Sequence, residues 1–110
     1  MNADEYLKAA QRTMGLHTKK EERMLNATLG LTGESGEVAD MIKKCLFHGH
    51  DLDRAKLIKE LGDIQWYIAQ MCTALDIALS EVMQKNIDKL LIRYPIDEGF
   101  SYERSINRAD

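Results

Sequence analysis

Hydrophobic residues recur at helical spacing along most of the chain. The first such stretch predicts a helix over residues 3–14, which Asn2 can cap and Gly15 can end. Thr18 and Glu21 then show the spacing of a capping box, in which each side chain bonds a free amide at the start of a second helix. That helix is predicted to run to about Phe47, where FHGHD interrupts the pattern.

Two further helices are predicted in the second half of the chain. One opens near Asp53, and the other opens near Ser80 and stops at Pro95, because proline cannot continue the helical hydrogen bonds. The polar tail after Pro95 has room for one short helical turn. With no strand-like alternation, flexible linker or internal repeat, residues 1–110 are predicted to form a single all-α domain, a bundle-like arrangement of four to five helices.

Acidic pairs occur at the same spacing on the second and third predicted helices. Glu34 and Glu37 lie one turn apart in GLTGESGEVAD, and Glu60 and Asp63 lie one turn apart in ELGD. If these helices pack as an antiparallel hairpin, four carboxylates converge. Clustered carboxylates repel one another and lose hydration, which a divalent cation relieves. All four are hard oxygen ligands, so the pattern favours Mg²⁺, with Mn²⁺ as a substitute.

The acidic pairs alone leave other interpretations open. Each pair is also typical of a solvated helix face, and a non-catalytic helical module braced by metal fits the same spacing. A di-iron carboxylate bundle is disfavoured because these helices lack Glu-x-x-His pairs. His48 and His50 flank Gly49 without a third ligand, so neither is assigned to the site.

Composition excludes several other classes. Hydrophobic residues make up 45% and charged residues 30% of the chain, as in soluble globular domains. A formal charge of −3 without a basic run argues against nucleic-acid binding. No apolar stretch approaches the roughly 20 residues of a membrane span, and there is no signal-peptide pattern, which predicts a cytoplasmic protein. Cys45 and Cys72 lack metal-ligand spacing and are predicted to be buried thiols, with a disulfide disfavoured.

The two acidic segments resemble a known family signature. LGLTGESGEVADMIKK followed by KELGDIQWYIAQ is similar to the E-x-x-E, spacer, E-x-x-D pattern of MazG-type nucleoside triphosphate pyrophosphohydrolases, in the all-α NTP pyrophosphatase superfamily. EYLKAAQRT and SEVMQKNIDKLLIRYPIDEGF resemble that family's first helix and its fourth helix with the following turn, so the resemblance covers nearly the whole chain.

The resemblance implies hydrolysis of a nucleoside triphosphate to monophosphate and pyrophosphate, with Glu34, Glu37, Glu60 and Asp63 as magnesium ligands and catalytic groups. It implies removal of surplus or non-standard nucleotides. A special substrate, such as phosphoribosyl-ATP or a pyrimidine deoxynucleotide, is the alternative. Family members form dimers or tetramers with bundles shared between chains. Since the chain has few aromatic residues to build a core, a homo-oligomer is expected, a tetramer rather than a dimer.

Candidate substrate-binding residues follow from position on the predicted helices. Lys44 lies two turns beyond Glu37 on nearly the same side and can reach a phosphate, while Tyr67 lies one turn after Asp63, where its ring can face a base. Trp66 points elsewhere and is expected to pack in a core or interface. By resemblance the fourth helix adds substrate contacts, from Asn86 to sugar or phosphate and from Lys89 and Arg93 to phosphate.

Overall fold

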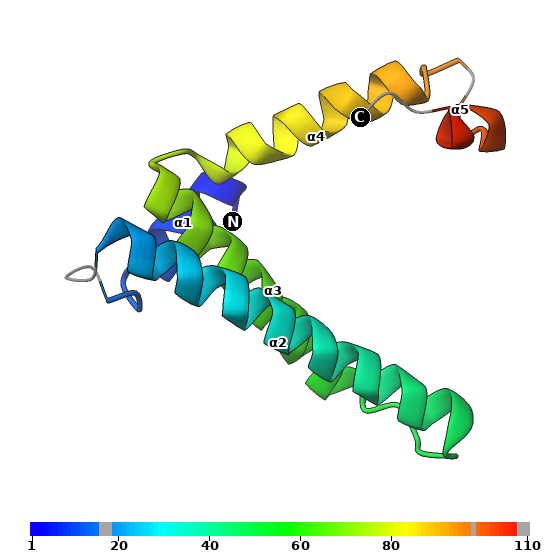
Figure 1. Ribbon diagram of the computed structural model, residues 1–110, viewed down its shortest axis with the longest axis horizontal. Helices are drawn as coiled ribbons and strands as arrows, with labels where there is room; N and C mark the ends of the chain where they lie inside the picture. Colours follow the sequence, from blue (N-terminus) through cyan, green and yellow to red (C-terminus); the bar gives the residue numbers. More distant parts are fainter. Residues whose placement is uncertain (16–18, 98, 108–110) are drawn as a thin grey trace.

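The computed structural model describes residues 1–15, 19–97 and 99–107. These residues form helices and no strand, which confirms the all-α prediction. Two long helices dominate: α2, Lys20–Phe47, and α3, Arg54–Leu75. They lie side by side as a hairpin (Figure 1). Among the described residues, no helix combines the length and the apolar content that crossing a bilayer requires.

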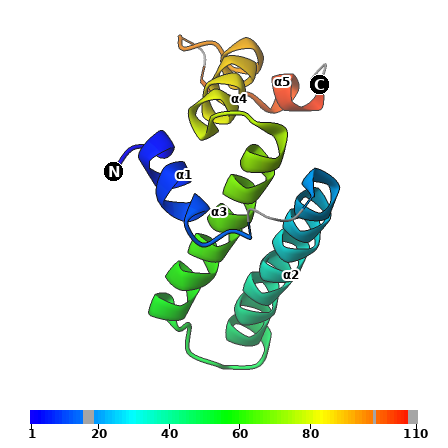
Figure 2. The ribbon, with the colours of Figure 1, turned by 90° about the vertical axis from the view of Figure 1, so that its left-hand side faces the viewer.

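Three shorter helices complete the fold: α1, Ala3–Gln11; α4, Leu79–Arg93; and α5, Tyr102–Ile106. Helix α3 lies between α1 and α2 (Figure 2). Helix α4 leaves the end of α3 and diverges from the hairpin, and α5 lies near the far end of α4 (Figure 1). The short turn predicted in the polar tail is therefore present as α5.

Local capping explains two of the predicted helix starts. Asn2 Oδ1 accepts a hydrogen bond from the Glu5 amide at 2.8 Å, and Asp53 Oδ1 accepts one from the Lys56 amide at 3.0 Å. These bonds satisfy amides that have no partner in the first helical turn.

The capping box predicted for the second helix includes Thr18, which lies outside the described residues. Helix α2 begins at Lys20, and Lys19 at its N-cap makes no side-chain capping bond. The predicted C-terminal limit at Phe47 is confirmed.

The prediction that the first helix reaches Met14 is wrong, because α1 ends at Gln11. The Thr13 hydroxyl donates to the Ala10 carbonyl at 2.8 Å and accepts from Trp66 Nε1 at 2.8 Å. These bonds hold the chain in a turn that brings Met14 into the core, where it is buried. A tertiary contact with α3 thus sets the end of α1.

The apolar core lies where α1, α3 and the start of α4 meet. Its buried members are Leu7, Ala10, Met14, Ala69, Cys72 and Leu79. Trp66 packs against this cluster, as predicted for it. Both cysteines are free thiols, but only Cys72 is buried; the prediction that Cys45 is buried is wrong, because it is half-buried.

Small and polar residues join the two helices of the hairpin. Ala27 is 1% exposed, and Asn26 Nδ2 donates to Gln70 Oε1 at 3.0 Å. The apolar faces predicted from periodicity are only partly covered, because Leu46 is 69% and Leu61 52% exposed. Each helix carries more apolar surface than one neighbouring helix can cover.

Candidate functional site

Three of the four predicted acids meet between the hairpin helices. Glu34 and Glu37 extend from α2 and Glu60 from α3, and each offers a carboxylate oxygen within 4.8 Å of the others. Antiparallel packing produces this cluster, because the middle of one helix lies beside the middle of the other. We call Glu34, Glu37 and Glu60 the acid cluster.

Burial differs within the acid cluster, where Glu37 is exposed and the other two acids are partly or fully removed from solvent. Glu60 is 9% exposed and Glu34 is half-buried. One oxygen of each, Oε2 in both cases, is buried without a hydrogen-bond partner in the described chain. A hydrogen bond with Glu34 raises the pKa of Glu60, and burial and the Glu34 charge raise it further.

Asp63, the fourth predicted acid, lies at the edge of the acid cluster. It is exposed and follows Glu60 by one turn of α3. Its charge contributes to raising the pKa of Glu60, so the two groups are near each other. Its oxygens do not belong to the set within 4.8 Å.

The donor set fits a hard divalent cation. Carboxylate oxygens are the ligands that Mg²⁺ and Mn²⁺ prefer. The partnerless buried oxygens of Glu34 and Glu60 have no internal donor to satisfy them, and a cation would satisfy both. The site can therefore hold a metal, with Asp63 available at its edge.

A cleft of about 610 Å³ adjoins the acid cluster towards the hairpin loop. Glu37 lines it, and so do Gly33 and Gly36, where a Cβ would meet nothing within 4 Å. Two of the glycines that weaken α2 thus leave open space next to a metal-binding side chain. The cleft is large enough for a polyphosphate group.

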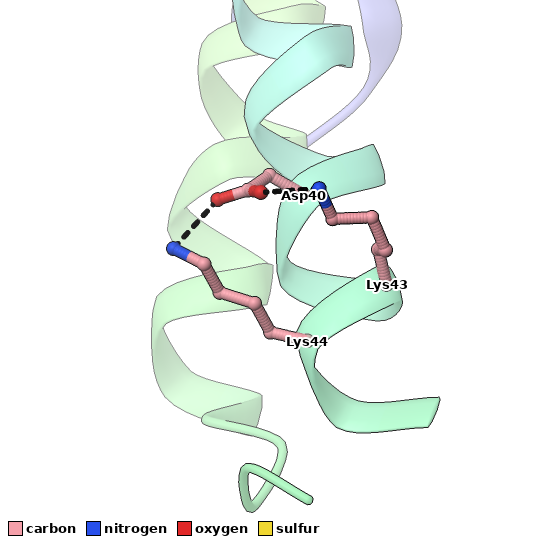
Figure 3. A network of polar contacts seen from close by, with 3 residues as sticks. All are labelled: Asp40, Lys43 and Lys44. Carbon is pink, nitrogen blue, oxygen red and sulfur yellow. Dashed lines mark ion pairs between the residues drawn. The ribbon is translucent and has the colours of Figure 1, made fainter. Parts of the chain in front are cut away.

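Lys44 lines this cleft together with Glu37, on the same side of α2. Its Nζ atom is 2.8 Å from Asp40 Oδ2, while Lys43 Nζ is 3.7 Å from the other carboxylate oxygen (Figure 3). The hydrogen bond from Lys44 holds the pKa of Asp40 below its usual value. Lys43 does not line the cleft, although it pairs with the same acid.

Sequence reasoning did not assign to the site five polar residues that line the cleft: Asp40, His50, Asp51, Asp53 and Lys56. Asp40 and Lys56 carry a signal that could have found them. Asp40 continues the spacing of Glu34 and Glu37 by another three residues, and Lys56 precedes Glu60 by one helical turn. His50 carries no such signal, because the path of the loop alone brings it into the cleft.

Tyr67 contacts α2 rather than facing open solvent. A Cβ added at Gly30 would collide with its ring, so the ring lies directly against the backbone of α2. It also makes an edge contact with Trp66, with ring centroids 5.1 Å apart. Gly30 therefore differs from Gly33 and Gly36, since it makes room for an aromatic ring of the same chain.

The predicted substrate residues on α4 lie apart from the acid cluster within one chain. Helix α4 packs mainly against α1 and diverges from the hairpin (Figure 1). Asn86 lines a separate groove with α1 and α3. Lys89 is exposed, and Arg93 lies farther along α4, with its guanidinium 5.9 Å from the Tyr94 ring centroid.

A model of the MazG nucleotide pyrophosphohydrolase domain matches residues 21–96. The chain belongs to this family. The MazG match spans the hairpin, and with it both acidic pairs, and continues through α4. The chain is also 42% identical over 76 residues to the Gene 37 protein of Mycobacterium phage L5. The aligned segment covers 66% of this chain and 67% of that protein. No solved structure matches this chain significantly.

Membership of the MazG family confirms the resemblance seen in the sequence and places the chain among nucleotide pyrophosphohydrolases. The acid cluster and the adjoining cleft both lie inside the matched segment. The acid cluster and the cleft are thus the candidate active site of this MazG domain.

Proposed function

We propose that this chain is a magnesium-dependent pyrophosphohydrolase that converts a nucleoside triphosphate and water to the monophosphate and pyrophosphate. The observation that carries the proposal is the pair of buried, partnerless oxygens on Glu34 and Glu60, beside Glu37, in a chain of the MazG family. Mn²⁺ has similar ligand preferences and is expected to substitute.

The acid cluster would hold the cation, with Asp63 as a fourth ligand at its edge. A bound divalent cation would neutralise charge on the phosphate oxygens as water attacks the α-phosphorus. A carboxylate oxygen of these four residues that is free of the metal would orient the water and accept its proton.

The cleft would receive the phosphates that leave as pyrophosphate. Lys44 and Lys56 line it on opposite helices, so their ammonium groups can donate hydrogen bonds to phosphate oxygens from two sides. Gly33 and Gly36 leave room for the phosphates to approach α2. Lys44 can keep its bond to Asp40 while doing so, since an ammonium group has three donors.

We also propose that the working unit is a homo-oligomer, a tetramer rather than a dimer, formed by single-domain chains whose bundles are shared. Large apolar side chains on α4 are exposed, among them Ile87 at 50% and Ile92 at 80%. Burying them against another copy would remove this surface from water. It would also bring α4 of one chain, with Lys89 and Arg93, against a neighbouring chain.

A nucleotide panel tests the proposed reaction. Purified protein is incubated with Mg²⁺ and each ribo- and deoxynucleoside triphosphate, and monophosphate, pyrophosphate and orthophosphate are measured. Monophosphate and pyrophosphate in equal amounts are expected, with turnover lost on chelation and restored by Mg²⁺ or Mn²⁺. A preference for non-standard nucleotides would support a role in removing them from the cytoplasmic pool, and a strong preference for one pyrimidine deoxynucleotide would indicate the special-substrate alternative.

Two results would contradict the proposal. Release of orthophosphate would show that a different bond is cleaved. Metal binding without turnover of any nucleotide, including phosphoribosyl-ATP, would instead favour a metal-braced interaction module. For substitutions of an acid of the cluster by glutamine, Glu81→Gln is the matched control. Glu81 is an exposed acid in the first turn of α4, away from the acid cluster.

A further inference from the structure

The two histidines of the hairpin loop look alike in the sequence but lie in different places. His48 and His50 flank Gly49, and both side chains are exposed. His50 lines the cleft that adjoins the acid cluster, whereas His48 does not. The proposed reaction uses neither of them. His50 is thus a polar residue of the candidate active site without an assigned role.

The turn after α2 places His50 in the cleft. The Lys44 carbonyl accepts hydrogen bonds from the His48 amide and from the His50 amide, both at 3.1 Å. Gly49 between them has a φ of +71°, a left-handed conformation that glycine adopts without a steric penalty. The chain therefore folds back over the last turn of α2 and is held there by backbone bonds. These bonds fix the backbone of His50 beside that of Lys44 before any ligand binds.

Side-chain nitrogen donors from three segments line this end of the cleft: Lys44 from α2, His50 from the loop and Lys56 from α3. Within residues 1–15, 19–97 and 99–107, the side chains of His50 and Lys56 have no hydrogen-bond or ion-pair partner. An imidazole ring donates from one nitrogen when it is neutral and from both when it is charged, so His50 can bond an anion in either state.

The acids that line the cleft do not cancel the attraction of these donors for an anion. Asp40 is paired with Lys44 at 2.8 Å. Asp53 Oδ1 accepts a hydrogen bond from the Lys56 amide, so its charge faces the start of α3. Asp51 is exposed, and water and salt screen an exposed charge. A phosphate group can therefore approach the loop end of the cleft.

The donors lie on the loop side of the acid cluster. Lys44 follows Glu37 by seven residues, a rise of about 10 Å along α2. Lys56 precedes Glu60 by four residues, about 6 Å along α3. Since the two helices are antiparallel, both displacements point towards the loop that holds His50 (Figure 2). A phosphate chain that begins at the acid cluster and runs along the cleft would therefore end near His50.

We propose that His50, together with Lys56, binds the terminal phosphate of the substrate and thereby selects triphosphates over diphosphates. The inference rests on the proposed function, which puts the α-phosphorus at the acid cluster and the two leaving phosphates in the cleft. A diphosphate ends one phosphate group short of the loop, so it would bind at the acid cluster without a bond to His50. His50 is a specificity-determining residue in this arrangement, and no proton transfer is required of it.

The pair of loop histidines supplies both the test and its control. His50→Ala removes the donor, and His48→Ala removes an exposed histidine that lies outside the cleft. In His50→Ala, kcat/KM for a nucleoside triphosphate should fall about tenfold, as for the loss of one hydrogen bond to a charged group. The inhibition constant of the corresponding diphosphate should stay within about twofold of the wild-type value. His48→Ala should change neither quantity.

The variant His50→Gln separates a lost donor from a disturbed loop. Glutamine keeps an N–H donor, so kcat/KM for the triphosphate should return to within about threefold of the wild-type value. His50→Gln that is as impaired as His50→Ala would overturn the assignment. An equal loss for triphosphate and diphosphate in His50→Ala would also overturn it, and so would an equal effect of His48→Ala and His50→Ala.

Calorimetry with inorganic pyrophosphate and Mg²⁺ separates failure of this assignment from failure of the proposed reaction. The affinity for pyrophosphate should fall about tenfold in His50→Ala and stay at the wild-type value in His48→Ala. That result supports the assignment even if no triphosphate is hydrolysed. Equal affinities in His50→Ala and the wild type, or no binding of pyrophosphate to the wild type, would overturn the assignment even if triphosphates are cleaved to monophosphate and pyrophosphate.

Discussion

The α2–α3 hairpin buries acidic groups between its helices, whereas α4 leaves apolar groups in solvent. Glu60 is 9% exposed, while Ile92 is 80% exposed. Both arrangements are unfavourable in an isolated chain, because buried charges lose hydration and apolar surfaces order water. The contrast is the basis of two of our proposals, a cation in the hairpin and another copy of the chain on α4.

The two regions also differ in how they are held. The hairpin helices contact each other along much of their length, and the Asn26–Gln70 bond and the ring of Tyr67 on Gly30 link them. Helix α4 is attached mainly at its first turn, where Ser80 bonds Asp4. Substitutions in the hairpin should therefore affect chemistry and folding, and substitutions along α4 should affect assembly.

The largest expected effect is the loss of a metal ligand. Glu60→Gln and Glu37→Gln should each lower kcat/KM by about a hundredfold or more, because a metal contributes several kcal/mol to the transition state and each 1.36 kcal/mol is tenfold. Circular dichroism should show an unchanged fold, since no packing group is lost. Near wild-type activity in both variants, with Glu81→Gln as reference, would remove the acid cluster from the mechanism.

The second-largest effect is expected from a charge placed on the exposed apolar face of α4. Ile87→Glu should reduce the particle mass measured by light scattering, because a charge at a buried interface loses hydration without a partner. The fold of each chain should persist, since Ile87 is half exposed in the single chain. A wild-type protein that is already monomeric would show that α4 has no partner copy.

Packing inside the hairpin predicts an effect of about 1–3 kcal/mol. Gly30→Ala should lower the free energy of unfolding by that amount, because the new methyl group collides with the Tyr67 ring. Gly62→Ala should instead raise it by up to about 1 kcal/mol, since alanine favours helix and nothing lies within 4 Å of the new Cβ. Chemical denaturation measures both. Equal effects would mean that Tyr67 does not pack on Gly30.

The raised pKa of Glu60 predicts opposite pH dependences with and without metal. Magnesium affinity should fall as the pH decreases through that pKa, which lies above the ordinary glutamate value, because the protonated acid cannot bind a cation. In the metal-free protein the folded state binds the proton more tightly than the unfolded state. The stability contributed by Glu60 is then present below its unfolded pKa and lost as the pH rises through its folded pKa.

Melting curves from about pH 4 to about pH 7, with magnesium and with chelator, measure both trends. In Glu34→Gln the principal cause of the raised pKa of Glu60 is removed, so the change in the metal-free protein should move to lower pH. Identical profiles for Glu34→Gln and the wild type would contradict the interaction between the two acids.

The smallest expected effect concerns the two lysines that share Asp40. Lys44→Ala should raise KM for a nucleoside triphosphate about fivefold, close to 1 kcal/mol, because an ammonium group in the cleft is lost. Lys43→Ala removes the same charge outside the cleft and should leave KM within about twofold. Steady-state kinetics measure both values of KM. An equal rise in KM for the two variants would show that only the net charge matters and would contradict a role for Lys44 in the cleft.

The sequence determined the helices and the residues that carry their chemistry. Caps such as Asn2 and Asp53, and Pro95 after α4, act on neighbouring backbone groups, so their effects are local and readable in sequence. The spacing of Glu34 and Glu37 fixed a shared helix face in the same way. The family resemblance, confirmed by the MazG match, came from these local patterns.

Tertiary structure decided how the faces meet. Periodicity gives the direction of a side chain around its own axis, but not the rotation and depth of the neighbouring helix. Packing alone therefore put Glu60 within 4.8 Å of the α2 acids, left Asp63 at the edge and ended α1 before Met14. It also separated three glycines that look equivalent in sequence: Gly30 receives the Tyr67 ring, whereas Gly33 and Gly36 border an open cleft, because only the first faces an aromatic side chain across the hairpin.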